Sequence, residues 1–208
     1  MIWRQISRKY GISLNPKKSL FGLEEGNLLG HTISKYGIQI DPTRIEAILQ
    51  IQHPRNIREL QAFLGKINFL WKFISNLVEL IRSLNNILKK DSTIKWIVEA
   101  KKSFEDIKLA LNKTPVLINP KFDRDFILFS FASEHTIAAV LLQKNDQGYE
   151  QPIAFFSKAL RDAPLRYNIM EKQAFALVKA IKDFRVYILY SHRVAYVPNS
   201  IVKDILTQ

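Results

Sequence analysis

The sequence predicts a mixed fold of the α+β or α/β class, and three stretches with different residue patterns support that prediction. Residues 10–40 carry glycine and proline between short apolar runs, which is typical of small strands joined by tight turns. Residues 42–112 instead place apolar side chains at helical spacing. After residue 113 the pattern becomes strand, turn and strand, which indicates a mixed sheet accompanied by helices.

The helical stretch divides into successive helices with recognisable ends. Asp41-Pro42 offers an N-cap with proline at the first helical position, and His53-Pro54 ends that helix. Asn56 starts the next helix in the manner of a capping box. The apolar stripe of this second helix comprises Ile57, Leu60, Phe63, Leu64, Ile67, Leu70, Trp71 and Ile74. Further helices are expected at about 76–88 and 98–111.

The segment after residue 113 predicts an antiparallel meander followed by a helix and a last short strand. The strands are expected at 126–131, 137–143 and 152–157, the helix at about 170–187 and the last strand at 194–197. The connections between the first strands carry polar turn residues, which suits hairpins.

Composition narrows the possible functions. The 208 residues include no cysteine, and the four histidines show no ligand spacing, so a metal could be held only by carboxylates. A net charge of +12, spread along the chain, favours a polyanion such as nucleic acid as partner, although charge that merely maintains solubility is an equal alternative. No apolar run approaches membrane-spanning length and no signal peptide is visible, so we expect no membrane partner and an intracellular location, cytoplasmic or nuclear.

A second stripe of the helix from Ile57 lies opposite its apolar stripe and carries polar and basic residues around one glycine. Its members are Arg58, Gln61, Gly65, Asn68 or Phe69, and Lys72. A glycine in mid-helix costs about 1 kcal/mol relative to alanine, so Gly65 calls for the close approach of another group. That group could be a sugar-phosphate backbone or a second helix crossing tightly, and spacing alone favours neither.

Six segments together resemble the polyprotein of gypsy-class (Metaviridae-like) LTR retrotransposons, of the plant kind. They read NLLGHTISKYGIQIDPTRIEAI (27–48), RELQAFLGKINFLWKFI (58–74), TPVLINPKFDRDFILFSFAS (114–133), QPIAFFSKAL (151–160), YNIMEKQAFALVKAIKDFR (167–185) and AYVPNSIVKDIL (195–206). The resemblance implies that residues 1–41 are the end of a reverse-transcriptase palm with a primer-grip-like hairpin. It implies a helical thumb at 42–112 and a truncated, connection-like ribonuclease H-like domain at 113–208.

The resemblance also implies a nucleic-acid-binding set. The LGH hairpin is similar to the primer grip, which would place Leu29, Gly30 and His31 against the primer backbone. The FLGKIN helix resembles the thumb helix that follows the minor groove, which favours the nucleic-acid explanation for Gly65. The full set of expected binding residues is Leu29, Gly30, His31, Arg58, Gln61, Gly65, Asn68, Phe69 and Lys72. The expected partners are RNA-DNA or DNA duplex and the remainder of a retrotransposon Pol polyprotein.

The same resemblance predicts a degenerate nuclease site. Where the family carries three metal-binding carboxylates, this chain has Phe131, Gln173 and Pro198. Two-metal hydrolysis needs such carboxylates, so we expect no catalytic residue, no metal site, no cofactor and no cleavage. The YxDD aspartates of the polymerase should precede residue 1, so we expect no polymerisation by this chain alone.

Two alternatives remain open at this stage. The domain could be an active ribonuclease H that uses Mg²⁺ to cut the RNA strand of RNA-DNA hybrids, or the reading frame could be a relic without function. The intact apolar pattern of the strands and of the helix at 174–181 favours a domain that still folds.

Overall fold

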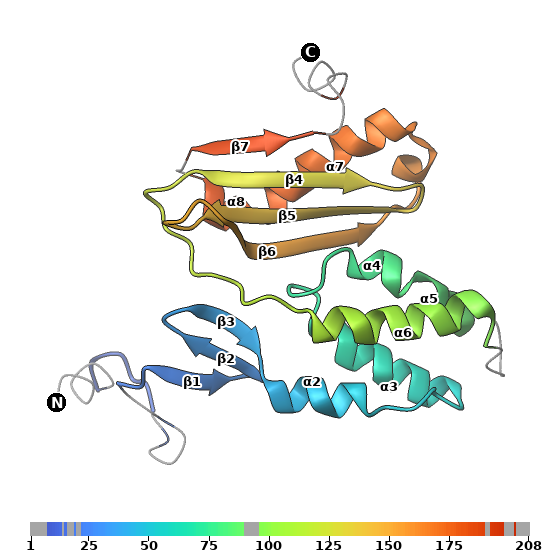
Figure 1. The fold of residues 1–208 in the computed structure, drawn as a ribbon, viewed down its shortest axis with the longest axis horizontal. Helices are drawn as coiled ribbons and strands as arrows, with labels where there is room; N and C mark the ends of the chain where they lie inside the picture. Colours follow the sequence, from blue (N-terminus) through green and yellow to red (C-terminus); the bar gives the residue numbers. More distant parts are fainter. Residues whose placement is uncertain are drawn as a thin grey trace.

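The computed structural model describes residues 8–13, 15, 19, 22–89, 96–189, 192–197 and 202, and its mixed α and β architecture confirms the predicted fold class. A four-stranded sheet lies on one side of a group of helices, and a three-stranded sheet lies beside these helices (Figure 1). The first sheet is an antiparallel meander of β1 (Glu25–Leu28), β2 (His31–Ser34) and β3 (Gly37–Ile40). None of the helices in these ranges is long and apolar enough to cross a bilayer.

Helices connect the two sheets along the chain, and those that begin at Pro42, Ile57 and Val98 start where the sequence predicts them. The helices of this stretch are α2 (Pro42–Leu49), α3 (Ile57–Asn68), α4 (Leu77–Leu80), α5 (Arg82–Leu88) and α6 (Val98–Asn112). The Asp41 side chain accepts from the Thr43 amide at the start of α2, and that of Asn56 accepts from the Glu59 amide at the start of α3. Each cap satisfies an amide that the first helical turn leaves without a partner.

The end of α3 and the following helix differ from the prediction. The amides of Leu70 and Phe73 donate to the carbonyls three residues earlier, at 2.9 Å each, so the chain leaves α3 at Asn68 through tight turns. These turns bury Leu70 and Phe73, and Phe69 and Lys72 therefore lie beyond the helix on which they were expected. The helix expected at 76–88 is interrupted at Ile81, which separates α4 from α5.

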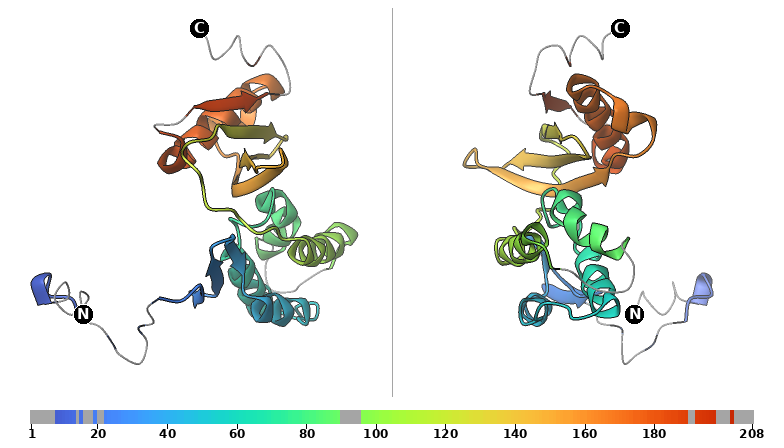
Figure 2. Two further views of the ribbon diagram at one scale, coloured as in Figure 1. Left: turned by 60° about the vertical axis from the view of Figure 1, so that its left-hand side comes forward. Right: turned by 90° about the vertical axis from the view of Figure 1, so that its right-hand side faces the viewer.

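The second sheet has the strand order β6-β5-β4-β7. It is built from β4 (Phe126–Ala132), β5 (Thr136–Lys144), β6 (Glu150–Ala159) and β7 (Arg193–Tyr196), with β4 and β7 parallel and the other pairs antiparallel. After β6 the chain forms a short 3₁₀ helix, η1 (Ala163–Arg166), then α7 (Ile169–Asp183) and α8 (Arg185–Ile188). These two α-helices cover one face of the sheet (Figure 2).

Buried apolar side chains form two clusters. One fills the space between the helices and the first sheet and includes Ile40, Ile48, Leu60, Phe63, Ile67, Phe104, Ile107 and Leu117. The other lies between the second sheet and α7 and includes Phe126, Leu128, Ala132, Ile137, Ala176, Leu177, Ala180 and Phe184. Leu117 pairs with Ile38 of β3 through two backbone hydrogen bonds of 2.8 Å, and Ile118 donates to Pro152 of β6 at 2.9 Å. The connecting segment is therefore bonded to both sheets.

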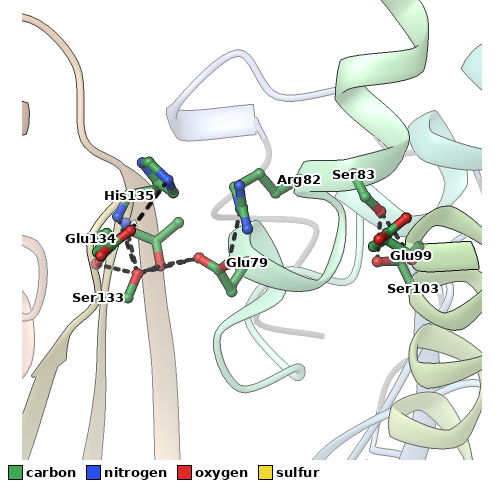
Figure 3. A network of polar contacts seen from close by, with 9 residues as sticks. Glu79, Arg82, Ser83, Glu99, Ser103, Ser133, Glu134 and His135 are labelled. Carbon is green, nitrogen blue, oxygen red and sulfur yellow. Dashed lines mark hydrogen bonds and ion pairs between the residues drawn. The ribbon is translucent and has the colours of Figure 1, made fainter.

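A carboxylate on α4 links the helical part to the second sheet (Figure 3). Glu79 accepts from Thr136 Oγ1 at 2.8 Å and from Ser133 Oγ at 3.3 Å, both at the β4–β5 turn. Arg82 Nε donates to the same carboxylate at 2.9 Å. Burial alone would raise the pKa of Glu79, but the hydrogen bonds from Thr136 and Arg82, together with the charge of Arg82, outweigh burial and lower it.

Candidate nucleic-acid interface

The β1–β2 hairpin turns through two residues in the left-handed region. Leu29 has φ 53° and Gly30 has φ 77°, and Leu28 pairs with His31 on either side of them. This geometry suits the right-handed twist of a hairpin but is costly for a leucine, by about 1 kcal/mol. Leu29 is nevertheless 78% exposed, so its side chain projects from the tip of the turn.

His31 connects the hairpin to the turns after α3. Its ring stacks on Phe69 and Phe73, with centroid separations of 4.9 and 5.1 Å. Burial lowers the pKa of His31, and the positive charges of Arg44 and Lys72 lower it further, against a backbone hydrogen bond at Leu28 that raises it. The lowered pKa favours the neutral imidazole, which suits aromatic stacking.

Arg44, from α2, is part of the same cluster, although sequence reasoning did not select it. Its guanidinium carbon lies 4.0 Å from the ring centroid of Phe69. A Cβ atom added at Gly30 would overlap its Nη1 atom, so a larger residue would displace the end of this arginine, and the φ of 77° itself favours glycine. A single arginine in a short helix carries no local signal, because its position depends on how α2 packs against the hairpin.

The polar row of α3 is exposed along its length. Arg58, Gln61, Gly65 and Asn68 are all exposed, and their spacing of three and four residues places them on one side of the helix. A Cβ at Gly65 would meet nothing within 4 Å among the described residues. The tight helix crossing considered as an explanation for Gly65 is therefore wrong within the described part of the chain.

The nine residues predicted to bind nucleic acid thus fall into two neighbouring groups. The α3 row is one. The other gathers the hairpin residues with Phe69 and Lys72 around a cavity of about 310 Å³, which Leu29, His31, Phe69 and Lys72 help to line. The backbone carbonyl of Lys72 accepts from the Phe155 amide of β6 at 3.3 Å, so this second group also borders the second sheet.

The positions expected to be degenerate lie in the second sheet and α7. Phe126, Leu128 and Ala132 of β4 pack toward α7, so strand alternation places Phe131 on the opposite face, where it is 53% exposed. Gln173 lies on α7, and its Oε1 atom is buried without a hydrogen-bond partner in the part of the chain that the structure describes. Pro198 lies outside the described residues.

These positions do not suit the Mg²⁺ ions that a ribonuclease H uses. A phenylalanine ring offers no donor atom, and the carbonyl of Gln173 is a single neutral ligand. The neighbouring Lys172 is buried and donates from Nζ to the Glu134 carbonyl at 2.9 Å, which adds a positive charge beside the site. Across the described ranges, no three or more His, Asp or Glu side chains gather closely enough to hold a metal ion.

Comparisons with known proteins show which proteins this chain resembles. Residues 96–195 match the family described as the RNase H-like domain found in reverse transcriptase. The chain is 34% identical over 175 residues to the Transposon Tf2-3 and Tf2-4 polyproteins of Schizosaccharomyces pombe, covering 84% of this chain and 13% of each polyprotein. It therefore spans about one eighth of the length of these curated relatives.

Two solved structures share the fold over most of the chain. The foamy viral protease-reverse transcriptase in complex with dsDNA matches with a TM-score of 0.73 and 27% identity, over 92% of this chain and 40% of that chain. The same viral protein in complex with RNA/DNA hybrid matches with a TM-score of 0.72 and 25% identity, over 95% of this chain and 28% of that chain. The protein is thus similar to a segment of retrotransposon polyproteins, and its residues 96–195 carry the RNase H-like domain found in reverse transcriptase.

Proposed function

We propose that this chain binds template-primer duplex, RNA-DNA or DNA, and that its RNase H-like domain does not cleave nucleic acid. The observation that carries the proposal is the exposed row of Arg58, Gln61, Gly65 and Asn68 on α3, with open space at Gly65. The viral reverse transcriptases of similar fold, solved with dsDNA and with RNA/DNA hybrid, support it.

The chemistry of the row suits a nucleic-acid backbone. Guanidinium and amide groups donate hydrogen bonds to phosphate and sugar oxygens, and these contacts set the position of a protein on a duplex without reading its sequence. The missing side chain at Gly65 would let the helix backbone approach the groove. The net charge of +12 would add long-range attraction to the phosphates.

The proposal assigns each segment a place in a larger enzyme. Residues 1–41 would form the end of the palm, 42–112 the thumb and 113–208 a connection-like domain. The remainder of a Pol polyprotein would be a natural partner, because the relatives are several times longer. The proposal also includes a finer classification of the chain as part of a gypsy-class element of plant origin. The relatives named above come instead from a fungus, so they do not support the plant origin.

The absence of cleavage rests on Phe131 and Gln173. Two-metal hydrolysis requires carboxylates that hold both cations and help generate the attacking hydroxide. In place of two of them the chain carries an exposed aromatic ring and a buried neutral amide. The competing proposal is an active ribonuclease H.

A cleavage assay on an RNA-DNA hybrid with labelled RNA separates the two proposals. We expect the RNA strand to stay intact with the purified chain in Mg²⁺, while the hybrid binds in a salt-dependent manner. Cleavage that EDTA abolishes and that a Gln173→Ala variant lacks would establish the competing proposal. An active ribonuclease H of another source, run in parallel, verifies that the hybrid can be cut.

A further inference from the structure

We propose that Arg44 is a phosphate-binding residue, which holds the backbone of the strand that lies against the Leu29-Gly30 turn. This inference rests on the proposed function, because it names a further contact within the same duplex interface.

The first argument is that the Arg44 side chain already packs against the hairpin and Phe69. Its guanidinium lies on the Phe69 ring at 4.0 Å, and the absence of a side chain at Gly30 leaves the space that it fills. Arg44 is half-buried, so part of its conformational freedom is already lost before any ligand binds. A group that is held in advance binds its ligand at a smaller entropic cost.

The second argument is that the donors of this side chain are not used. A guanidinium carries five N–H donors, and those of Arg44 form no hydrogen bond or ion pair with any described residue. The nearby carboxylate of Asp41 is already occupied. It accepts from the Thr43 amide at 2.9 Å, the Thr43 hydroxyl at 2.7 Å and the Asn27 amide nitrogen at 2.6 Å.

The third argument is the sign of the local charge. Arg44 and Lys72 both act on His31 as positive charges, so two cations lie near the base of the turn. The guanidinium carbon of Arg44 lies 4.0 Å from the Phe69 ring centroid, and its N–H donors form no hydrogen bond with any described residue, so they remain for a ligand. A phosphate can accept two parallel hydrogen bonds from a guanidinium. Its negative charge complements that of the guanidinium, which a neutral amide or a water molecule does not.

Arg44 could instead act only as a packing residue that holds the hairpin on Phe69. The two roles differ in how binding depends on salt, since each phosphate contact contributes about 0.9 to the slope of log Kobs against log salt concentration on B-form duplex. A residue that only packs changes stability without changing that slope.

The test measures binding of the full chain to a fluorescein-labelled DNA duplex by anisotropy between about 50 and 200 mM salt, the range in which phosphate contacts dominate. The variants are Arg44→Gln, Arg44→Lys and the matched control Arg166→Gln, an exposed arginine of η1 in the other half of the molecule. We expect Arg44→Gln to weaken binding about tenfold and to reduce the slope by about one. Arg44→Lys should keep the slope and bind with intermediate affinity, because its charge remains but the paired edge is lost.

The control and the unaltered chain make the outcomes distinct. A slope for Arg44→Gln equal to that of Arg166→Gln, with the unaltered chain binding normally, overturns the role of Arg44 and leaves the proposed function standing. Failure of the unaltered chain to bind any duplex overturns both. Because Arg44→Gln could loosen the hairpin, thermal melting accompanies each titration, and the slopes of all variants are compared at a temperature at which each of them is folded.

Discussion

Two regions differ in how they hold polar groups: the cluster of Gly30, His31, Arg44 and Phe69 at the β1–β2 hairpin, called the hairpin junction below, and the surroundings of β4. At the junction, aromatic rings are partly covered and support charged groups whose donors are free, as with Phe69 beneath Arg44. Around β4, the Phe131 ring is exposed on the face away from α7, while the Gln173 carbonyl and the Ser130 hydroxyl are buried without a hydrogen-bond partner among the described residues. The difference is what the proposed function expects of a chain that binds a polyanion and does not hold the metal ions of a nuclease.

The largest effect is expected when side chains of the α3 row are removed together with Lys72, which lies beyond the end of α3. We expect the triple variant Arg58→Ala, Gln61→Ala and Lys72→Ala to weaken duplex binding about a hundredfold, since each loses a donor to the phosphate backbone. Anisotropy titrations measure the loss.

A triple variant of the same residue types in the other half provides the control. Gln147→Ala, Arg166→Ala and Lys182→Ala change three exposed side chains and the net charge equally. Equal losses in the two triple variants would show that binding follows total charge alone and would remove α3 from the interface.

Substitution of Gly30 tests the support beneath the turn. We expect Gly30→Ala to destabilise the fold by about 2 kcal/mol, because alanine is strained at φ 77° and its Cβ would overlap Arg44. Gly22→Ala is the matched control, since φ is 71° there and nothing lies within 4 Å of the added atom. Urea unfolding of both variants isolates the contribution of Arg44 as the difference. A Gly30→Ala variant no less stable than Gly22→Ala would mean that Arg44 moves away freely.

Gly65 should show opposite effects on stability and binding. We expect Gly65→Ala to raise the free energy of unfolding by about 1 kcal/mol, because alanine favours the helix and the space around it is open. If a duplex backbone lies against this position, the same variant binds several-fold more weakly. Thermal melting and anisotropy on one preparation measure both. Ala62→Gly, on an exposed neighbouring turn of α3, should lower stability and leave affinity unchanged.

The two regions also differ in how far the sequence predicted them. The starts of α2 and α3 follow from Asp41 and Asn56, since caps act within a few residues. The end of α3 does not, because the turns at Leu70 and Phe73 depend on burial against distant helices. The contact of Arg44 with Gly30 and Phe69 likewise depends on packing between separate elements. The hairpin and the polar stripe of α3 could therefore be predicted from the sequence, but this contact could not.

Glu79 provides the mildest test, because it links the helical part to the turn just after Phe131. The pKa of Glu79 in the folded protein lies below its ordinary value of 4.5. Its hydrogen bonds to Thr136 and Ser133 therefore stabilise the fold fully at pH values above 4.5, and this stabilisation is lost as the pH falls through the folded pKa. The carboxylate is partly solvated, so the effect should stay under about 1 kcal/mol. Urea unfolding between pH 6 and 3, compared among the unaltered chain, Glu79→Gln and the exposed Glu46→Gln, should show the loss of stability in acid reduced in Glu79→Gln alone. If all three curves have the same shape, the Glu79 carboxylate does not stabilise the contact between the helical part and the second sheet, which the backbone hydrogen bond from Phe155 to Lys72 would then maintain without it.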